Sequence, residues 1–250
     1  MYERQDYKNP PIQEAVCEFM FANGDWDPTT PGKLFEVMGG KYSATPKPVK
    51  KYHAQIGAGP TIAARASIRE LPSLTKFSTP DELMSVTVGP QFLSVSMGRP
   101  YSDWETLQEQ ILDAYEKYRE VTSADEVLRV GIRYINHIVI DSSKPVVLKK
   151  YFKCVPQDLS DLKHPDLPVT SGALLSRNVY GFTDSIRMNH MFGTTDSPEG
   201  TIGVLLDIDV YWQQVVGESP DVAVLIERLR LRERVAFEAS IKDACRRLFK

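Results

Sequence analysis

Asp207 and Asp209 form the sharpest chemical pattern in the sequence. They lie in the run 201–212, whose apolar positions predict a strand, so both carboxylates share one face about 7 Å apart. Such a pair can hold Mg²⁺ beside a phosphate, as in phosphoryl transfer. It can equally form ion pairs with arginines on neighbouring strands. A catalytic site would also need a third acid or a glycine-rich phosphate loop, and we find neither motif, so we favour ion pairs and keep both aspartates only as weak metal-ligand candidates.

A second run, residues 128–141 (LRVGIRYINHIVID), predicts a central strand. Its even positions are apolar and its odd positions include Arg129, Arg133 and His137, the period-two pattern of a strand with one buried face. Asn136 interrupts the apolar row, and we expect its amide to bond to the backbone or to a polar partner because an unpaired buried amide is costly.

These two strands predict a charged surface if they belong to one sheet. Alternate positions of each strand then meet on the same side, with opposite charges facing each other across the ladder. We therefore name six residues as a candidate binding surface: Arg129, Arg133, His137, Asp207, Asp209 and Tyr211.

A lysine-rich stretch provides a different candidate site. The segment 41–51 holds Lys41, Lys47, Lys50 and Lys51, with Tyr42 and Tyr52 nearby, and this combination of positive charge with stacking surface is typical of nucleic-acid binding. The whole chain carries 33 acidic and 30 basic residues, a net charge of −3, so no global field draws it to nucleic acid. Nucleic-acid binding through this stretch is an alternative that we do not favour.

Other motifs that could carry chemistry are weak. The four histidines show no HxH or HxxxH spacing, the pattern of a local metal site. His190 lies on an apolar face, so we expect it to have a structural role, and we regard His137 as the more plausible functional histidine. The segment 57–60 is glycine-rich but lacks the Gly-Lys-Ser/Thr ending of a phosphate loop, so we interpret it as a turn. The three cysteines are far apart, which predicts free thiols, with Cys17 and Cys245 in the core. We expect no cofactor.

Turn residues and apolar periodicity predict the elements that hold these residues. A short helix is expected to begin at Pro31 and stop at Gly39-Gly40. A second begins at Ser102 as part of a capping box, and a third, of about 30 residues, begins with Ser219 as its N-cap and runs to Lys250, with a bend possible at 228–234. The third helix is expected to bury Leu225, Leu229, Val235, Ile241, Cys245 and Leu248. Strands are expected at 14–21, 83–88, 92–97, 128–141, 146–155, 172–182, 185–192 and 201–212, with further short ones between 52 and 98.

The order of these elements predicts an α+β protein with a mostly antiparallel sheet and the mid-chain and C-terminal helices packed on one side of it. Strands and helices do not alternate regularly, which argues against a doubly wound parallel sheet. A meander followed by a helix occurs twice, so we predict a single unit, 1–250, built from two similar lobes, 1–141 and 142–250. The acidic, proline-bearing segment 156–171 is expected to be a mobile loop or a lobe boundary.

The N-terminal sequence and the composition point to the cytoplasm. Charges and prolines stand where a secretory signal would need an apolar run, and no window approaches a spanning helix, so we expect no membrane association. Neither composition nor charge predicts an oligomeric state.

Four segments resemble one family of proteins. Asn9-Pro10-Pro11-Ile12 with 14–19, Val88-Gly89-Pro90 with 93–95, Arg133-Tyr134-Ile135-Asn136, and 206–210 are similar to a sporadically distributed family of uncharacterised bacterial proteins found in variable gene cassettes. The resemblance spans the chain and implies one conserved unit. It also implies an accessory, defence-linked role, and no catalytic residues.

Our leading functional hypothesis is a non-enzymatic binding or adaptor protein that docks to a protein partner. Aromatic residues near predicted turns are its expected anchors: Trp26, Tyr101, Trp104, Tyr211 and Trp212. The rival hypothesis is a metal-dependent enzyme acting on nucleotides or nucleic acid, with Asp207 and Asp209 as ligands and Arg133 or His137 facing the phosphate.

Overall fold

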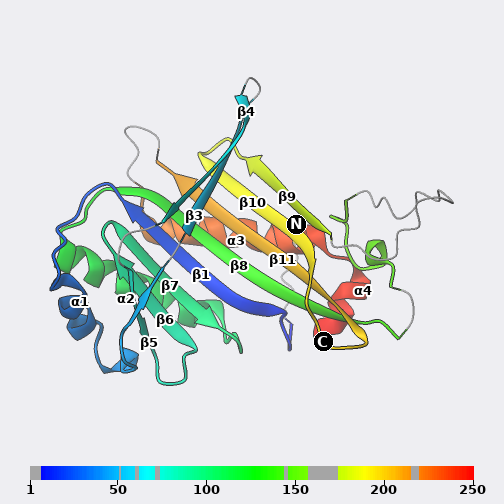
Figure 1. The fold of residues 1–250 in the computed structure, drawn as a ribbon, viewed down its shortest axis with the longest axis horizontal. Helices are drawn as coiled ribbons and strands as arrows, with labels where there is room; N and C mark the ends of the chain where they lie inside the picture. The colour runs from blue at the N-terminus through cyan, green and yellow to red at the C-terminus, as the bar shows by residue number, and fades with distance from the viewer. Residues whose placement is uncertain are drawn as a thin grey trace. The chain divides into compact units, whose positions relative to one another are not determined.

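The computed structural model describes most of the chain (Figure 1). The described residues are 7–50, 52–59, 62–70, 74–143, 146–156, 174–214 and 220–250, with the backbone alone described for 52–59 and 62–70. The predicted turn 57–60 and the predicted loop 156–171 lie largely outside the described side chains. Among the described residues, no helix is both long enough and apolar enough to cross a membrane.

The fold is α+β, as predicted, and antiparallel strands dominate it. Nine strands form one sheet in the order β2-β5-β6-β7-β1-β8-β11-β10-β9, and β3 (Tyr52–Gly59) pairs with β4 (Ile62–Glu70) separately. The chain forms two compact units: unit 1 holds Met1–Val16, Gly98–Tyr101 and Val130–Lys250, and unit 2 holds Cys17–Met97 and Ser102–Arg129. The strands β1 (Ile12–Phe21) and β8 (Val127–Asp141) contribute residues to both units.

Unit 2 is a meander covered by one long helix. Besides β3, β4 and most of β1, this unit holds β2 (Lys47–Val49), β5 (Leu74–Ser78), β6 (Met84–Gly89) and β7 (Phe92–Gly98), of which the last two form the predicted hairpin. The helix α2 (Trp104–Thr122) packs aromatic rings against β1, where Tyr118 stacks on Phe21. The Tyr118 hydroxyl also donates to the Gly89 carbonyl at 2.8 Å. The short helix α1 (Thr30–Met38) begins and ends as predicted and buries Leu34 and Met38.

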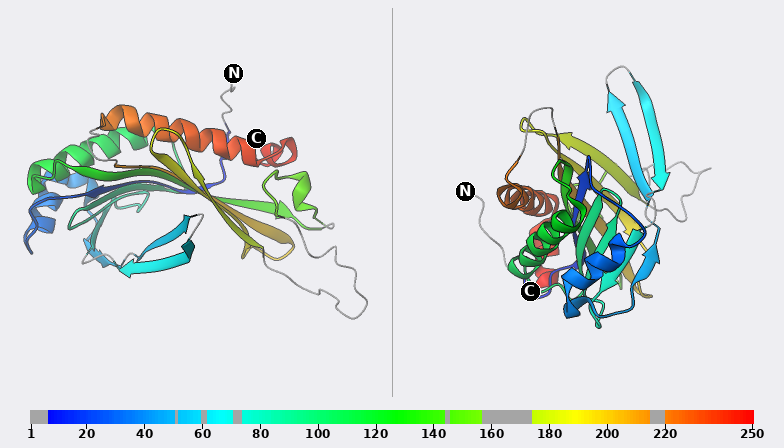
Figure 2. Two further views of the ribbon diagram at one scale, coloured as in Figure 1. Left: turned by 90° about the horizontal axis from the view of Figure 1, so that it is seen from above. Right: turned by 90° about the vertical axis from the view of Figure 1, so that its left-hand side faces the viewer.

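Unit 1 has the same two layers. Its strands β8, β9 (Leu175–Gly181), β10 (Ile186–Thr195) and β11 (Thr201–Gln213) lie in front of the helix α3 (Val222–Ser240) in Figure 1, and the left view of Figure 2 shows the helix and these strands as separate layers. A short helix, α4 (Asp243–Arg246), follows. The three predicted strands 172–182, 185–192 and 201–212 are thus confirmed, with small changes at their ends.

The period-two pattern of β8 and β11 is confirmed in the core. Val130, Ile132, Ile208 and Val210 are fully buried. Asn136 is buried among them, and its amide donates to the Leu206 carbonyl at 3.1 Å, which satisfies the expected need for a backbone partner. Leu128 departs from the prediction, since it is exposed at the start of the strand.

Two predicted helix caps are wrong by one or two positions. The N-cap of α2 is Asp103, whose carboxylate accepts from Thr106 N at 2.7 Å, so the Ser102 capping box does not form. The N-cap of α3 is Asp221, which accepts from Val224 N at 3.1 Å, while the predicted cap Ser219 lies outside the described residues. In both cases an aspartate close to the predicted serine provides the acceptor, and a carboxylate is among the strongest N-cap groups.

The C-terminal helix is shorter than predicted. It ends at Ser240 because Ile241 is extended and fully buried, where it bridges to Phe152. The buried face follows Val222, Leu225, Ile226, Leu229, Glu233, Phe237 and Ser240, so Val235 and Leu248 are exposed instead of buried. The break lies at the helix end and not in the arginine-rich stretch 228–234.

The predicted strand 146–155 does not form. Its centre is a short 3₁₀ helix, Leu148–Lys150, closed by bonds such as Tyr151 N to the Leu148 carbonyl at 2.9 Å. Three apolar residues, Val146-Val147-Leu148, are followed here by two charged ones, Lys149-Lys150, and this pattern lacks the strict alternation of a half-buried strand. Phe152 alone enters the core.

The N-cap of α2 gives a direct stability prediction. Asp103→Ala removes the acceptor of the Thr106 amide and is expected to lower the free energy of unfolding by about 1 kcal/mol. Ser102→Ala is the matched control, and we expect it to cost clearly less. Urea unfolding followed by far-ultraviolet circular dichroism measures both. A larger loss for Ser102→Ala would show that the capping box forms in solution after all.

Candidate functional site

The two faces of the unit 1 strands differ in chemistry. Even-numbered side chains of β8 and β10 face α3: the Arg230 guanidinium lies 4.5 Å from the Tyr134 ring centroid, and the His190 ring bonds to Ser240 at 2.8 Å. Odd-numbered side chains therefore point to the other face, which no described helix of unit 1 covers (Figures 1 and 2). We call this surface the open face.

Arg133 and Asp207 form a two-pronged ion pair on the open face. Arg133 Nε donates to Asp207 Oδ1 at 2.8 Å, and Nη2 donates to Oδ2 at 2.6 Å. The Arg133 side chain is 39% exposed and that of Asp207 only 7%, so the arginine covers the carboxylate. The bonds to Asp207 raise the pKa of Arg133. This confirms that the two predicted strands bring opposite charges together. Because both oxygens of Asp207 accept hydrogen bonds from Arg133, a cation at this carboxylate would compete with the guanidinium.

Asp209 lies one step further along β11 and has a different neighbour. It pairs with Asn189 of β10 in the sheet register, and the Asn189 amide donates to Asp209 Oδ2 at 3.1 Å. Its charge also contributes to the raised pKa of Arg133, as does that of Glu14 on β1. Tyr211 stands beside Arg187 in the same register. The open face thus carries acids, arginines and amides within a few ångströms of each other.

His137 has the predicted position on β8 but is enclosed. A side-chain carbon on Gly203 would come within 3.0 Å of His137 Nε2 and 2.8 Å of the Thr195 carbonyl, so the ring occupies space that only a glycine leaves. His137 Nε2 is buried and has no hydrogen-bond partner in the described part of the chain. Its ring is therefore less accessible to a ligand than the pattern of alternate positions suggested.

Arg129 belongs to unit 2. Its guanidinium lies 3.7 Å from the Glu18 carboxylate of β1, and both side chains are mostly buried. The predicted six-residue surface is therefore reduced in unit 1 to five residues.

The lysine-rich stretch contributes less stacking surface than its sequence suggested. Tyr42 is 1% exposed and its hydroxyl donates to Gln110 Oε1 at 3.3 Å, so it offers no ring to a base. Lys47 pairs with Glu82 at 2.8 Å, and Lys50 is exposed. Lys51 and the side chain of Tyr52 lie outside the described residues.

A buried charged cluster between α3 and the sheet was not predicted. Glu233 is 3% exposed and lies 2.6 Å from Arg230 Nη1, while the Tyr134 and Tyr101 hydroxyls bond to each other at 2.9 Å beside it. Burial raises the pKa of Glu233 to about 7, and the charge of Arg230 opposes this. The signal in the sequence was its spacing, because Glu233 falls on the same helical face as Leu225 and Leu229.

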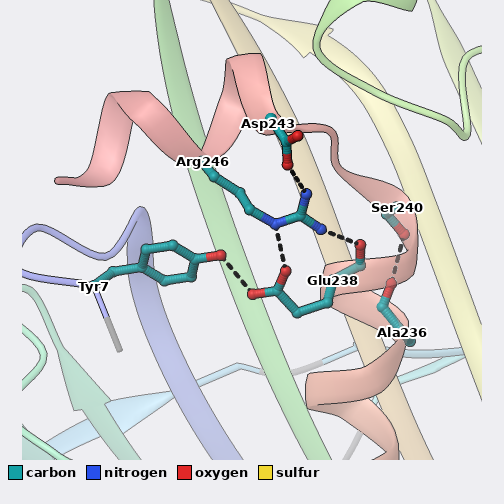
Figure 3. A network of polar contacts seen from close by, with 6 residues as sticks. All are labelled: Tyr7, Ala236, Glu238, Ser240, Asp243 and Arg246. Carbon is teal, nitrogen blue, oxygen red and sulfur yellow. Dashed lines mark hydrogen bonds and ion pairs between the residues drawn. The ribbon is translucent and has the colours of Figure 1, made fainter. Parts of the chain in front are cut away.

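A second network joins the N-terminal segment to the C-terminal helices (Figure 3). Glu238 is buried, accepts from the Tyr7 hydroxyl at 2.5 Å and pairs with Arg246 Nε at 2.8 Å, while Arg246 also reaches Asp243 at 2.7 Å. On the other side of the helix end, Ser240 donates to the Ala236 carbonyl at 2.7 Å. The serine proton is therefore committed to the backbone, and His190 Nε2 is assigned as donor to Ser240. This arrangement suits structural support and not a nucleophile.

No protein-family model matches the chain, and no curated protein matches its sequence significantly. The resemblance drawn from four short segments therefore stays a prediction, and the chemistry of the open face is the strongest guide to function.

The Arg133–Asp207 pair predicts a strong energetic coupling. Arg133→Ala leaves a largely buried carboxylate without its partner and is expected to cost about 1 to 3 kcal/mol of unfolding free energy. Adding Asp207→Asn should recover much of that loss, because a neutral amide needs no counter-charge. Urea unfolding of the two single variants and the double variant measures the coupling. The exposed Arg187→Ala, on the same face, should change stability by less than about 0.5 kcal/mol. Additive losses in the cycle would contradict the pair.

Glu233 predicts a pH-dependent stability. Its folded pKa of about 7 lies above the ordinary value of about 4.3, so its contribution to stability is fully present below about pH 4.3 and is lost as the pH rises through 7. Glu233→Gln mimics the protonated form, so this variant should have a higher Tm than the native chain at pH 8 and a flatter Tm profile between pH 5 and 8. Glu116→Gln, at an exposed position of α2, is the control. A Tm lowered equally at every pH would show that Glu233 is ionised in the fold.

Proposed function

We propose that this protein is a non-enzymatic binding protein that docks a protein partner on the open face of unit 1. The observation that supports the proposal is the set of partly exposed polar side chains on that face. Charged and amide side chains are held by the rigid sheet, and Arg133, Asn189, Asp209 and Tyr211 are half-exposed where no described helix of the unit covers them. Preorganised polar groups of this kind lose little conformational entropy on binding.

The mixture of charges favours a protein over a nucleic acid. Arg133 and Arg187 stand beside Asp209 and Glu14, so a phosphate backbone lying on the face would meet carboxylates as well as guanidinium groups. Sites for nucleic acid use a more uniform positive surface. A protein partner can present the complementary pattern of both signs, which also sets its orientation.

The predicted aromatic anchors contribute unequally. Trp212 is 3% exposed, so it belongs to the core and cannot serve as an anchor. Tyr101 is half-buried and its hydroxyl is bonded to that of Tyr134. Tyr211 is half-exposed on the open face, and we propose it as the aromatic contact of the partner.

The metal-dependent alternative has weaker support. Asp207 is already paired through both oxygens, and within the described ranges no three His, Cys, Asp or Glu side chains are grouped so that they could hold a metal ion. Following the family resemblance, we propose that the binding role is that of an accessory factor in a bacterial defence-type gene cassette.

We also propose that the chain consists of two related lobes. A strand, a three-strand meander and a 19-residue helix occur twice: β1, β5 to β7 and α2, and then β8, β9 to β11 and α3. The strand orders correspond, since β1-β7-β6-β5 matches β8-β11-β10-β9. This correspondence supports a boundary between α2 and β8, earlier than the predicted boundary after residue 141.

Charge reversal on the open face tests the proposed docking. Arg187 is exposed, so Arg187→Glu should leave the fold intact and lower partner capture at least about tenfold through like-charge contacts. Glu227→Arg, on the exposed side of α3, is the matched control and should capture as well as the native chain. The measurement is affinity capture from the source organism with quantitative mass spectrometry, followed by titration with the purified partner.

Two outcomes would contradict the docking proposal. One is equal capture by the native chain and Arg187→Glu. The other is capture that disappears after nuclease treatment, which would place nucleic acid at the centre of the interaction.

A further inference from the structure

The outer edge of β9 pairs with no strand in the described part of the chain. β9 is the last strand in the sheet order, with β10 as its one neighbour among the described strands (Figure 1). Thr194 N donates to the Leu174 carbonyl and Phe182 N to that of Ile186, both at 2.8 Å. Even-numbered residues of this segment therefore bond to β10. The amides and carbonyls of Leu175, Arg177, Val179 and Gly181 consequently point away from β10.

This edge lacks the features by which proteins block strand addition. It contains neither lysine nor proline, and Arg177 is its one charged residue. Apolar side chains are exposed along it and just after it: Leu175 is 72% exposed and Val179 49%, and Tyr180 and Phe182 are exposed to 46% and 41%. A long edge that is both apolar and open is a typical site of pairing.

The corresponding edge of the other lobe already has an added strand. By the matching strand orders, β5 is the counterpart of β9, and β5 pairs on its outer side with the short strand β2. The position equivalent to β2 beside β9 holds no described strand. This comparison rests on the proposed relation of the two lobes, whereas the hydrogen-bond directions do not.

We propose that β9 pairs antiparallel with β9 of a second copy, forming a twofold dimer through a continuous sheet. The favoured register places Asn178 opposite its own copy, so that Leu175 faces Gly181 and Arg177 faces Val179 of the second chain. This register overlaps the whole strand and pairs only residues whose backbone groups point outward, each pair exchanging two hydrogen bonds. No arginine faces an arginine directly, and the two Asn178 amides can bond to each other across the axis.

The symmetry has a consequence for the open face. Directly opposite residues of antiparallel strands point to the same side, so the two open faces would lie on one side of the joined sheet. A partner with two equivalent sites would then bind with higher avidity than either face alone provides.

Cross-linking at the axis tests the proposed register. Asn178 and its copy form a pair without mutual backbone hydrogen bonds, where Cα atoms are about 4.5 Å apart, a separation that a disulfide can span. Mild oxidation of Asn178→Cys should therefore give a covalent dimer. Arg177→Cys is the matched control on the same strand: its copy is displaced along the ladder, so it should cross-link at least about tenfold less. The native chain, with its own three cysteines, provides the baseline.

Sedimentation equilibrium over a range of concentrations tests the association itself. Val179→Lys adds a charge to the edge, and Val179→Pro removes an outward amide without breaking a bond to β10. Each should raise the dimer dissociation constant at least about tenfold with an unchanged circular dichroism spectrum. Val224→Lys makes the same kind of change on the exposed side of α3, where Val224 is 55% exposed, and should leave the constant unchanged.

Three results would contradict the proposed dimer. They are a monomer at all concentrations up to about 100 µM, a dimer insensitive to both Val179 variants, or a dimer weakened by Val224→Lys alone, which would move the contact to α3. Partner capture on the open face is measured separately with Arg187→Glu, so failure of the dimer leaves that proposal standing.

Discussion

The alternation of side chains along β8 and β11 is the constraint on which unit 1 depends. Even positions supply the fully buried Val130, Ile132 and Ile208 against α3, and odd positions supply Arg133 and Asp207 to the open face. A slip of one residue in either strand would move every apolar side chain outward and carry the charges into the core. The ion pair and the apolar layer therefore specify the same register, and a slip of one residue would disrupt both.

One polar group on the helix side, Asn136, reinforces that register. Asn136 can donate to the Leu206 carbonyl only when the two strands are aligned as observed, and Glu233 has its partner Arg230 on its own helix, stacked over Tyr134. A buried amide adds little net stability, but a misaligned sheet would leave Asn136 unpaired at a cost of about 1 to 3 kcal/mol, whereas the Glu233–Arg230 pair lies within one helix and does not depend on the strand register. Specificity of alignment is thus the better explanation for the presence of Asn136 in an otherwise apolar layer.

Local patterns predicted much of this fold because they report burial directly. Period-two apolar runs identified β1, β8, β10 and β11. The alternation also placed Arg133 and Asp207 on one face, whereas the choice of Arg133 as the partner of Asp207 was seen only in the structure. Features decided by tertiary contacts were not predicted. Ile241 ends α3 because a buried bridge to Phe152 is available to it, and His137 is enclosed because a glycine happens to lie across from it on β11. Neither neighbour is close in sequence, so no window of residues could have revealed them.

The same reasoning explains why the two outer edges of the sheet differ. An edge strand has one set of backbone groups that the sheet does not use, and their direction is set by which residues bond inward. At β5 that set meets β2, whose Lys47 and Pro48 limit further growth. At β9 the outward residues are Leu175, Arg177, Val179 and Gly181, and none of them opposes growth by charge or by a missing amide except Arg177. One edge of the sheet is thus blocked and the other permits strand addition. Pairing of the permissive edge with its own copy by twofold symmetry uses up that edge in both chains. The result is a closed dimer and not an open fibre.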